Sequence, residues 1–183
     1  MLDDNAYALR MAIYVALLRA VNVGGTGKLA MSELVSLCEA AGFARVKTYI
    51  QSGNVVFESK LSAVKSQAKL QTALAQGMGK PVEVLLRTRA ELDAIVERNP
   101  FKEAAPNQLL VLFLNVAPEK AALAGLTIPG REQVRLDGRE VFIHFPDGMG
   151  KSKLKLPFAS TATGRNLNTV RKLAAMAKEL EEA

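Results

Sequence analysis

The stretch VKTYIQSGNVVFE, residues 46–58, contains two β-prone runs separated by Ser52-Gly53. The runs cover residues 46–51 and 54–58, and a Ser-Gly connection between such runs is a hairpin signal because glycine accepts positive φ values. The stretch therefore predicts two antiparallel strands joined by a tight turn.

A strand and a helix are expected on each side of this hairpin. Residues 12–19 form an apolar run suited to a strand buried on both faces, and apolar residues recur at helical spacing over residues 34–41. Downstream, residues 61–78 carry a rough helical stripe, and a strand is expected over 82–87. The resulting order, β-α-β-β-α-β, is the ferredoxin-like or split β-α-β arrangement.

The second half has a related pattern without a clear final strand. Its expected elements are a helix at 89–98, a strand at 108–115, a helix at 118–126, a hairpin with arms 133–136 and 140–145 about Asp137-Gly138, and a closing helix at 166–181. We therefore expect an α+β protein of two ferredoxin-like subdomains with antiparallel sheets. The subdomains would cover residues 12–88 and 89–183, after a flexible extension at 1–11.

Composition restricts the class of protein. The chain of 183 residues is 49% hydrophobic and 23% charged, which is typical of a globular protein. Its apolar runs are too short to span a membrane, and Asp3 and Asp4 stand where a signal peptide carries positive charge, so we expect a cytoplasmic protein without membrane contact. Cys38 is expected in the core, and no residue spacing indicates a metal site or a bound cofactor.

The glycine-rich segment NVGGTGK, residues 22–28, is similar to a phosphate-binding P-loop but departs from it twice. Asn22 stands where the P-loop has its first glycine, and Leu29 replaces the hydroxyl residue that would bind magnesium. A parallel sheet of β-α-β units is also missing from the expected fold. These differences exclude a P-loop nucleotide hydrolase.

The expected topology brings this segment close to the hairpin turn. In a split β-α-β unit, the loop after the first strand and the turn between the second and third strands emerge at one end of the sheet. This end would gather polar and glycine residues typical of an anion site: Arg19, Asn22, Gly24, Gly25, Lys28, Gln51, Ser52, Gly53 and Asn54. Asn, Ser and Gly are also common turn formers, so the two turns could instead fix each other.

A second polar group lies near the closing helix. Arg165, Asn166 and Asn168 are expected at its start, where free N–H groups and the helix dipole favour an anion. Lys151 and Lys153 would add positive charge if their loop folded back over this helix end. The alternative is that Asn166 serves as a helix cap.

Several long motifs of the chain are those of one bacterial family. YVALLRAVNVGG (14–25), TYIQSGNVVFES (48–59), ERNPF (97–101) and TGRNLNTVRKL (163–173) resemble the domain-of-unknown-function family numbered sixteen ninety-seven. The family usually has Trp where this chain has Leu167, and Gly-Ile where it has Ala20-Val21. The resemblance implies two ferredoxin-like subdomains and no established activity. Its signature residues are Arg19, Asn22, Gly24, Gly25, Gln51, Ser52, Gly53, Asn54, Arg165, Asn166 and Asn168.

Three functions are compatible with these residues. The leading hypothesis is a binding protein for a phosphate-bearing ligand, either a small molecule or nucleic acid, which the net charge of +6 would favour. The alternatives are an enzyme acting on a small anionic metabolite and a structural or interaction scaffold. An RNA-recognition sheet is disfavoured because Tyr14 and Phe57 are the aromatic residues expected on its stacking strands.

Overall fold

The computed structural model describes residues 11–24 and 28–183, so the expected N-terminal extension lies almost entirely outside the described residues. The chain divides into two compact units. Unit 1 comprises the described residues up to Arg89 together with 176–183, and unit 2 comprises residues 90–175. Each unit contains a four-stranded antiparallel sheet. The predicted α+β fold class is confirmed.

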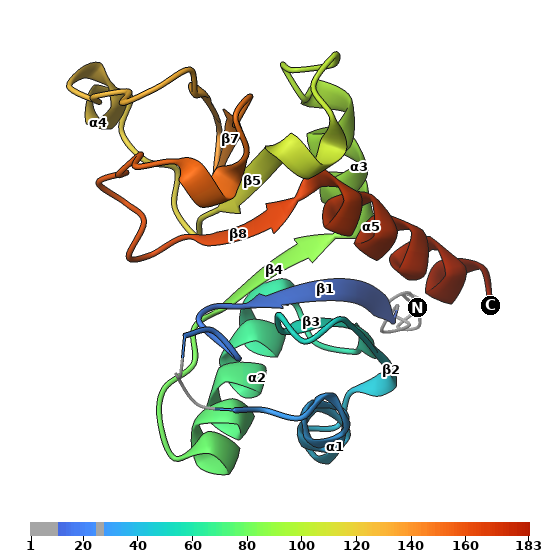
Figure 1. Cartoon of the computed structure of the whole chain (residues 1–183). Helices are drawn as coiled ribbons and strands as arrows, with labels where there is room; N and C mark the ends of the chain where they lie inside the picture. Colours follow the sequence, from blue (N-terminus) through green and yellow to red (C-terminus); the bar gives the residue numbers. More distant parts are fainter. Residues whose placement is uncertain (1–10, 25–27) are drawn as a thin grey trace, which may run out of the picture. The chain divides into compact units, whose positions relative to one another are not determined.

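Unit 1 has the expected ferredoxin-like order. Its elements are β1 (Ala12–Leu18), α1 (Met31–Ala40), β2 (Ala44–Tyr49), β3 (Asn54–Ser59), α2 (Ala63–Met78) and β4 (Val84–Thr88). The strands lie in the order β2-β3-β1-β4, and both helices cover one face of this sheet (Figure 1). The quoted hairpin is therefore β2 and β3, joined by a four-residue turn at 50–53.

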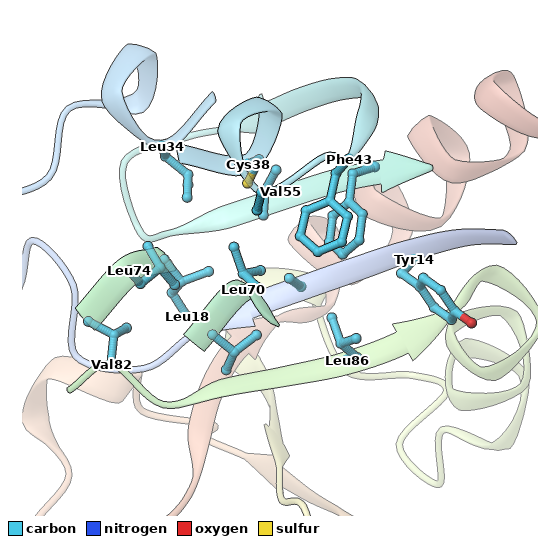
Figure 2. Close-up of a cluster of buried hydrophobic side chains, with 14 of the residues drawn as sticks. Tyr14, Leu18, Leu34, Cys38, Phe43, Val55, Leu70, Leu74, Val82 and Leu86 are labelled. Carbon is cyan, nitrogen blue, oxygen red and sulfur yellow. The ribbon is translucent and has the colours of Figure 1, made fainter. Parts of the chain in front are cut away.

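The core of unit 1 lies between this sheet and the two helices (Figure 2). Alternate residues of the strands point toward the helices, and the rings of Phe43 and Phe57 stack with their centroids 4.3 Å apart. Leu70 of α2 and Cys38 of α1 are fully buried in this cluster. Cys38 is thus a core residue, as the helical spacing predicts.

Unit 2 repeats the strand order with different covering elements. It contains α3 (Arg89–Arg98), a 3-10 turn η1 (Pro106–Gln108), β5 (Leu109–Phe113), α4 (Ala121–Ala124), β6 (Gln133–Asp137), β7 (Glu140–His144), a 3-10 turn η2 (Met149–Lys151), β8 (Thr163–Asn166) and α5 (Leu167–Glu182). The order β6-β7-β5-β8 corresponds to β2-β3-β1-β4 of unit 1. Residues 176–182 of α5 belong to unit 1.

The sequence pattern was misleading at three places in unit 2. A final strand is present: β8 pairs with β5, and its small, polar sequence hides it from hydrophobic periodicity. Gly164 fits there because a Cβ atom would lie 3.1 Å from side-chain atoms of both Leu110 and Leu112. The helix expected at 118–126 shortens to α4, and the hairpin turn is Gly138-Arg139 because Asp137 pairs with Glu140.

An irregular segment stands in unit 2 where unit 1 has its second helix. Burial alternates along residues 151–158, as it does in an extended chain. Leu154, Leu156 and Phe158 face inward and pack against the apolar cluster of unit 2. The alternate residues, Lys151, Lys153 and Lys155, are exposed, and we call these three lysines the basic strip.

Within residues 11–24 and 28–183, no helix combines the length and the apolar character that crossing a bilayer requires.

Candidate functional site

The loop after β1 is closed by the side chain of Asn22. Its Nδ2 atom donates hydrogen bonds to the carbonyl oxygens of Leu29 and Gln51, each at 2.8 Å. Its Oδ1 atom accepts a hydrogen bond from the N–H group of Leu29, also at 2.8 Å. Asn22 has φ +56, a left-handed conformation that asparagine tolerates better than most residues. The amide group of Asn22 is therefore directed at the protein's own backbone.

The β2–β3 turn is also held by internal hydrogen bonds. Asn54 is fully buried, and its Nδ2 atom donates to the carbonyl oxygen of Tyr49 and to Oγ of Ser52, each at 2.9 Å. The N–H group of Leu18 donates to the carbonyl oxygen of Gly53 at 2.8 Å. Gly53 has φ +78, and a Cβ atom on it would lie 2.8 Å from Cβ of Leu18. The loop after β1 thus contacts the β2–β3 turn through the hydrogen bond from Asn22 to Gln51. The same turn contacts the end of β1 through the hydrogen bond from Leu18 to Gly53.

Of the remaining predicted residues of this end, Arg19, Gly24 and Lys28 are at least partly exposed. Arg19 is about one-third exposed and forms a 4.0 Å ion pair with Glu83. Lys28 is exposed, and Gly24 has φ +54 with open space around it. Gly25 lies outside the described residues. A ligand role for these residues remains a prediction.

Two of the predicted residues near α5, Arg165 and Asn166, form hydrogen bonds within unit 2. Arg165 belongs to β8 rather than to the helix, and burial lowers the pKa of its guanidinium to about 10. Its Nη1 atom donates to Oγ1 of Thr163 at 2.8 Å and to the carbonyl oxygen of Gly164 at 2.9 Å. Oδ1 of Asn166 accepts the N–H of Thr169 at 2.9 Å, as a helix cap does, while Asn168 is exposed.

A groove in unit 2 contains the predicted residues Lys151 and Lys153. Its central cavity, of about 370 Å³, is lined by these lysines with Glu132, Asp147 and Ser152. A second cavity, of about 610 Å³, shares Lys153 with the first and adds Lys155. Arg165, Asn166 and Asn168 do not line either cavity.

A third cavity adjoins the central one and forms the aromatic end of the groove. This cavity, of about 500 Å³, shares Pro146 with the central one and is lined by Phe101 and His144. The rings of these two residues are 5.7 Å apart between centroids and tilted by 39°. We call the three adjoining cavities together the unit 2 groove.

Two carboxylates of the central cavity, those of Asp147 and Glu132, accept side-chain hydrogen bonds. Asp147 accepts two hydrogen bonds from Arg131, which lowers the pKa of Asp147, and Lys151 contributes to this effect. The hydroxyl of Ser152 donates to Glu132 and lowers the pKa of that carboxyl. Lys153 and Lys155 form no hydrogen bond or ion pair with another described residue. Positive charge therefore remains available along the basic strip.

Sequence reasoning missed much of this groove. Lys155, Phe101 and Arg131 were not singled out, although the alternation Lys-Ser-Lys-Leu-Lys at 151–155 is typical of an extended segment with one charged face. The described residues also contain no cluster of three or more His, Cys, Asp or Glu side chains able to hold a metal ion.

The comparisons with known proteins identify a family and a fold. Residues 11–142 match the family described as proteins of unknown function, DUF1697. A solved structure, that of a conserved bacterial protein from Streptococcus pneumoniae, is similar at 26% sequence identity with a TM-score of 0.76. The similarity covers 91% of this chain and 99% of that chain. No curated protein matches.

Because the family match covers more than half of the chain, the protein belongs to the DUF1697 family. The family resemblance inferred from the sequence motifs is confirmed. The family is described as one of unknown function, as the resemblance implied.

Proposed function

We propose that this DUF1697 protein binds a phosphate-bearing chain, such as single-stranded nucleic acid, along the unit 2 groove. The observation that carries the proposal is the basic strip, where three lysines occupy the exposed positions of one alternating segment. Leu154 and Leu156 of the same segment pack against the apolar cluster, which holds the backbone that carries the lysines in place.

The spacing of the lysines favours a ligand with repeating charges. Alternate residues of an extended chain are separated by about 6.6 Å. A row of ammonium groups at that spacing can meet successive phosphates of an extended nucleic acid, whereas a single phosphate would use one or two of them. The groove therefore suits a polyanion better than a small anion.

The charge balance of the groove supports the same ligand. Arg131 neutralises Asp147, and the three lysines of the basic strip outnumber the other two carboxylates that line the cavities, Glu132 and Glu103. Lys153 and Lys155 line the second cavity, and neither lines the aromatic cavity, so phosphates and an aromatic contact would use different parts of the groove. A cytoplasmic location belongs to this proposal, because that compartment supplies the ligand, and cell fractionation tests it.

The test is fluorescence anisotropy with labelled single-stranded oligonucleotides and with inorganic polyphosphate as competitor, over a range of salt. We expect the affinity to fall with salt, and the double variant Lys153→Gln/Lys155→Gln to reduce the log-log slope by about 0.7 for each lost contact. The matched control is Lys65→Gln/Lys69→Gln, which removes the same charge from the exposed face of α2.

Two results would contradict the proposal. One is the absence of oligonucleotide binding at low salt. The other is an equal loss of affinity in the two double variants, which would mean that net charge alone attracts the ligand.

A further inference from the structure

We infer that the aromatic end of the unit 2 groove, at Phe101 and His144, is a subsite for a nucleobase. The inference rests on the proposed function, because it names what accompanies the phosphates of the bound chain. It follows from the geometry of a cavity of about 500 Å³ whose lining includes both rings.

Phe101 is fixed in place although it is partly exposed. Its N–H group donates to Oδ1 of Asn99 at 2.9 Å, and its carbonyl oxygen accepts from Nδ2 of Asn99 at 3.4 Å. Asn99 itself is 4% exposed. One buried side chain therefore holds both backbone groups of Phe101, so ordering this part of the backbone costs a stacking ligand little conformational entropy.

The second ring has equally firm support. His144 is the last residue of β7, and it pairs with Leu109 of β5 and with Gln133 of β6. Its ring is tilted by 39° against Phe101, so the two rings form an angled surface rather than a closed stack. A flat base can pack against either ring, and base–aromatic stacking tolerates any base.

Polar groups at this end suit the edge of a base. Gln108 donates from Nε2 to the carbonyl oxygen of Pro146 at 3.2 Å, which orients its amide beside the cavity. Gln133 also lines the cavity and brings an exposed amide with a donor and an acceptor. Planar rings with amide groups around them are how proteins commonly recognise unstacked bases.

The aromatic end carries two basic side chains and one acidic side chain, an excess of positive charge that favours the phosphate of a nucleotide. Lys102, Arg131 and Glu103 line the cavity. The Arg131 side chain lines this cavity and pairs with Asp147, which lines the central cavity beside Lys151 and Lys153. A chain with phosphates on the strip can therefore place one base on Phe101 and His144.

The experiment uses His144 as an internal probe, because it is the one histidine of the chain. Its imidazole proton resonances are followed by NMR during titration with adenosine 5′-monophosphate, ribose 5-phosphate or inorganic phosphate. We expect the nucleotide to produce an upfield ring-current shift that the two ring-free probes do not produce. In Phe101→Leu, which keeps an apolar side chain, we expect a weaker shift and an oligonucleotide affinity reduced on the order of tenfold. Tyr49→Leu, which removes an aromatic ring from a partly buried position of β2 in unit 1, serves as the matched control.

The outcomes separate the two proposals. If oligonucleotide and polyphosphate bind equally well and Phe101→Leu changes neither affinity, the base subsite is wrong while the phosphate-binding function stands. If the nucleotide shifts His144 but polyphosphate does not bind, the subsite stands without the basic strip. If no probe shifts His144 and no oligonucleotide binds, both are overturned. Thermal unfolding of each variant confirms that a loss of binding is not a loss of folding.

Discussion

Unit 1 and unit 2 have the same strand order but cover their sheets differently. In unit 1, the connections after the first and third strands are α1 and α2, which cover one face of the sheet (Figure 1), whereas the corresponding connections of unit 2 are the four-residue α4, which has no buried residue, and the irregular segment at 151–158. Unit 1 has a groove of about 660 Å³ between its helices, but Ala and other small residues make up much of its lining, with Lys69 as the charged residue among those described there. The comparison shows that the strands fix the topology, while the covering segments decide which chemistry reaches the surface.

The comparison also separates two kinds of polar residue. Asn22 and Asn54 in unit 1 direct their amides at backbone carbonyls, and the turns they hold shape the end of the sheet. Lys153 and Lys155 in unit 2 have no such partner among the described residues. We infer that unit 1 uses its signature turns for folding and that unit 2 carries the ligand.

The largest expected effect is a loss of folding stability on truncating a buried leucine, compared between α2 of unit 1 and the irregular segment of unit 2. Leu70→Ala in α2 empties a fully buried position and should reduce the free energy of unfolding by about 2–5 kcal/mol. Leu154→Ala, at the partly buried position in unit 2, should cost less, about 1–2 kcal/mol. Urea unfolding followed by circular dichroism measures both. Equal losses would show that the irregular segment packs as firmly as the helix.

The next effect concerns two left-handed glycines in unit 1. Gly53→Ala combines an unfavourable φ with a contact on Leu18, and should destabilise by about 2–4 kcal/mol. Gly24→Ala has the same φ problem but open space, and should cost about 1 kcal/mol. Thermal unfolding gives the ranking. If Gly24→Ala were the more damaging change, the steric reason for Gly53 would be incorrect.

A smaller effect distinguishes a folding role from a binding role for Asn22. Asn22→Gly keeps the left-handed backbone and removes three hydrogen bonds, so we expect a loss of about 1–2 kcal/mol in the free energy of unfolding. Asn22→Ala should lose about 1 kcal/mol more because of its φ.

Oligonucleotide affinity should be unchanged in Asn22→Gly. A loss of affinity without a loss of stability would move the ligand site to unit 1 and reverse our assignment of the two units.

The smallest effect is a pH dependence of folding stability that is due to Cys38 and develops only at alkaline pH. Burial raises the pKa of its thiol from 9.0 to about 12, with a further contribution from Glu39. Because the folded state disfavours the thiolate, the stabilisation from the buried thiol is complete below pH 9 and is lost as pH rises toward 12. The stability difference between the native protein and Cys38→Ala should therefore be constant below pH 9 and shrink between pH 9 and 11, measured by urea unfolding. A constant difference would mean that the thiol reaches solvent.

The elements of unit 1 could be predicted because their signals are local. The hairpin follows from β-prone runs around Gly53, and the burial of Cys38 follows from helical spacing. β8 could not be found in this way, because Thr163–Asn166 has no hydrophobic alternation and becomes a strand through pairing with β5. Its polar residues instead suggested a helix start, and Asn166 does cap α5.

The candidate site was predicted less completely than the fold. Lys151 and Lys153 were singled out by charge, but Phe101 and His144 are 43 positions apart in sequence and meet only in the folded unit. Arg165 looked available to a ligand, whereas its place in β8 buries it and directs its guanidinium at Thr163 and Gly164. The exposure of a side chain depends on spatial neighbours that are distant in sequence, so local sequence patterns do not predict it.

By itself, the sequence determined the family, the order of strands and helices in unit 1 and the exclusion of a P-loop, because turn residues, apolar periodicity and motif spacing act over short stretches. Tertiary structure alone decided that Asn22 serves the neighbouring turn, that Thr163–Asn166 completes a sheet, and that the lysines of the basic strip share a groove with Phe101 and His144. The reason is physical: a polar side chain binds whichever partner the fold brings within hydrogen-bonding distance, and that partner is usually far away in the sequence.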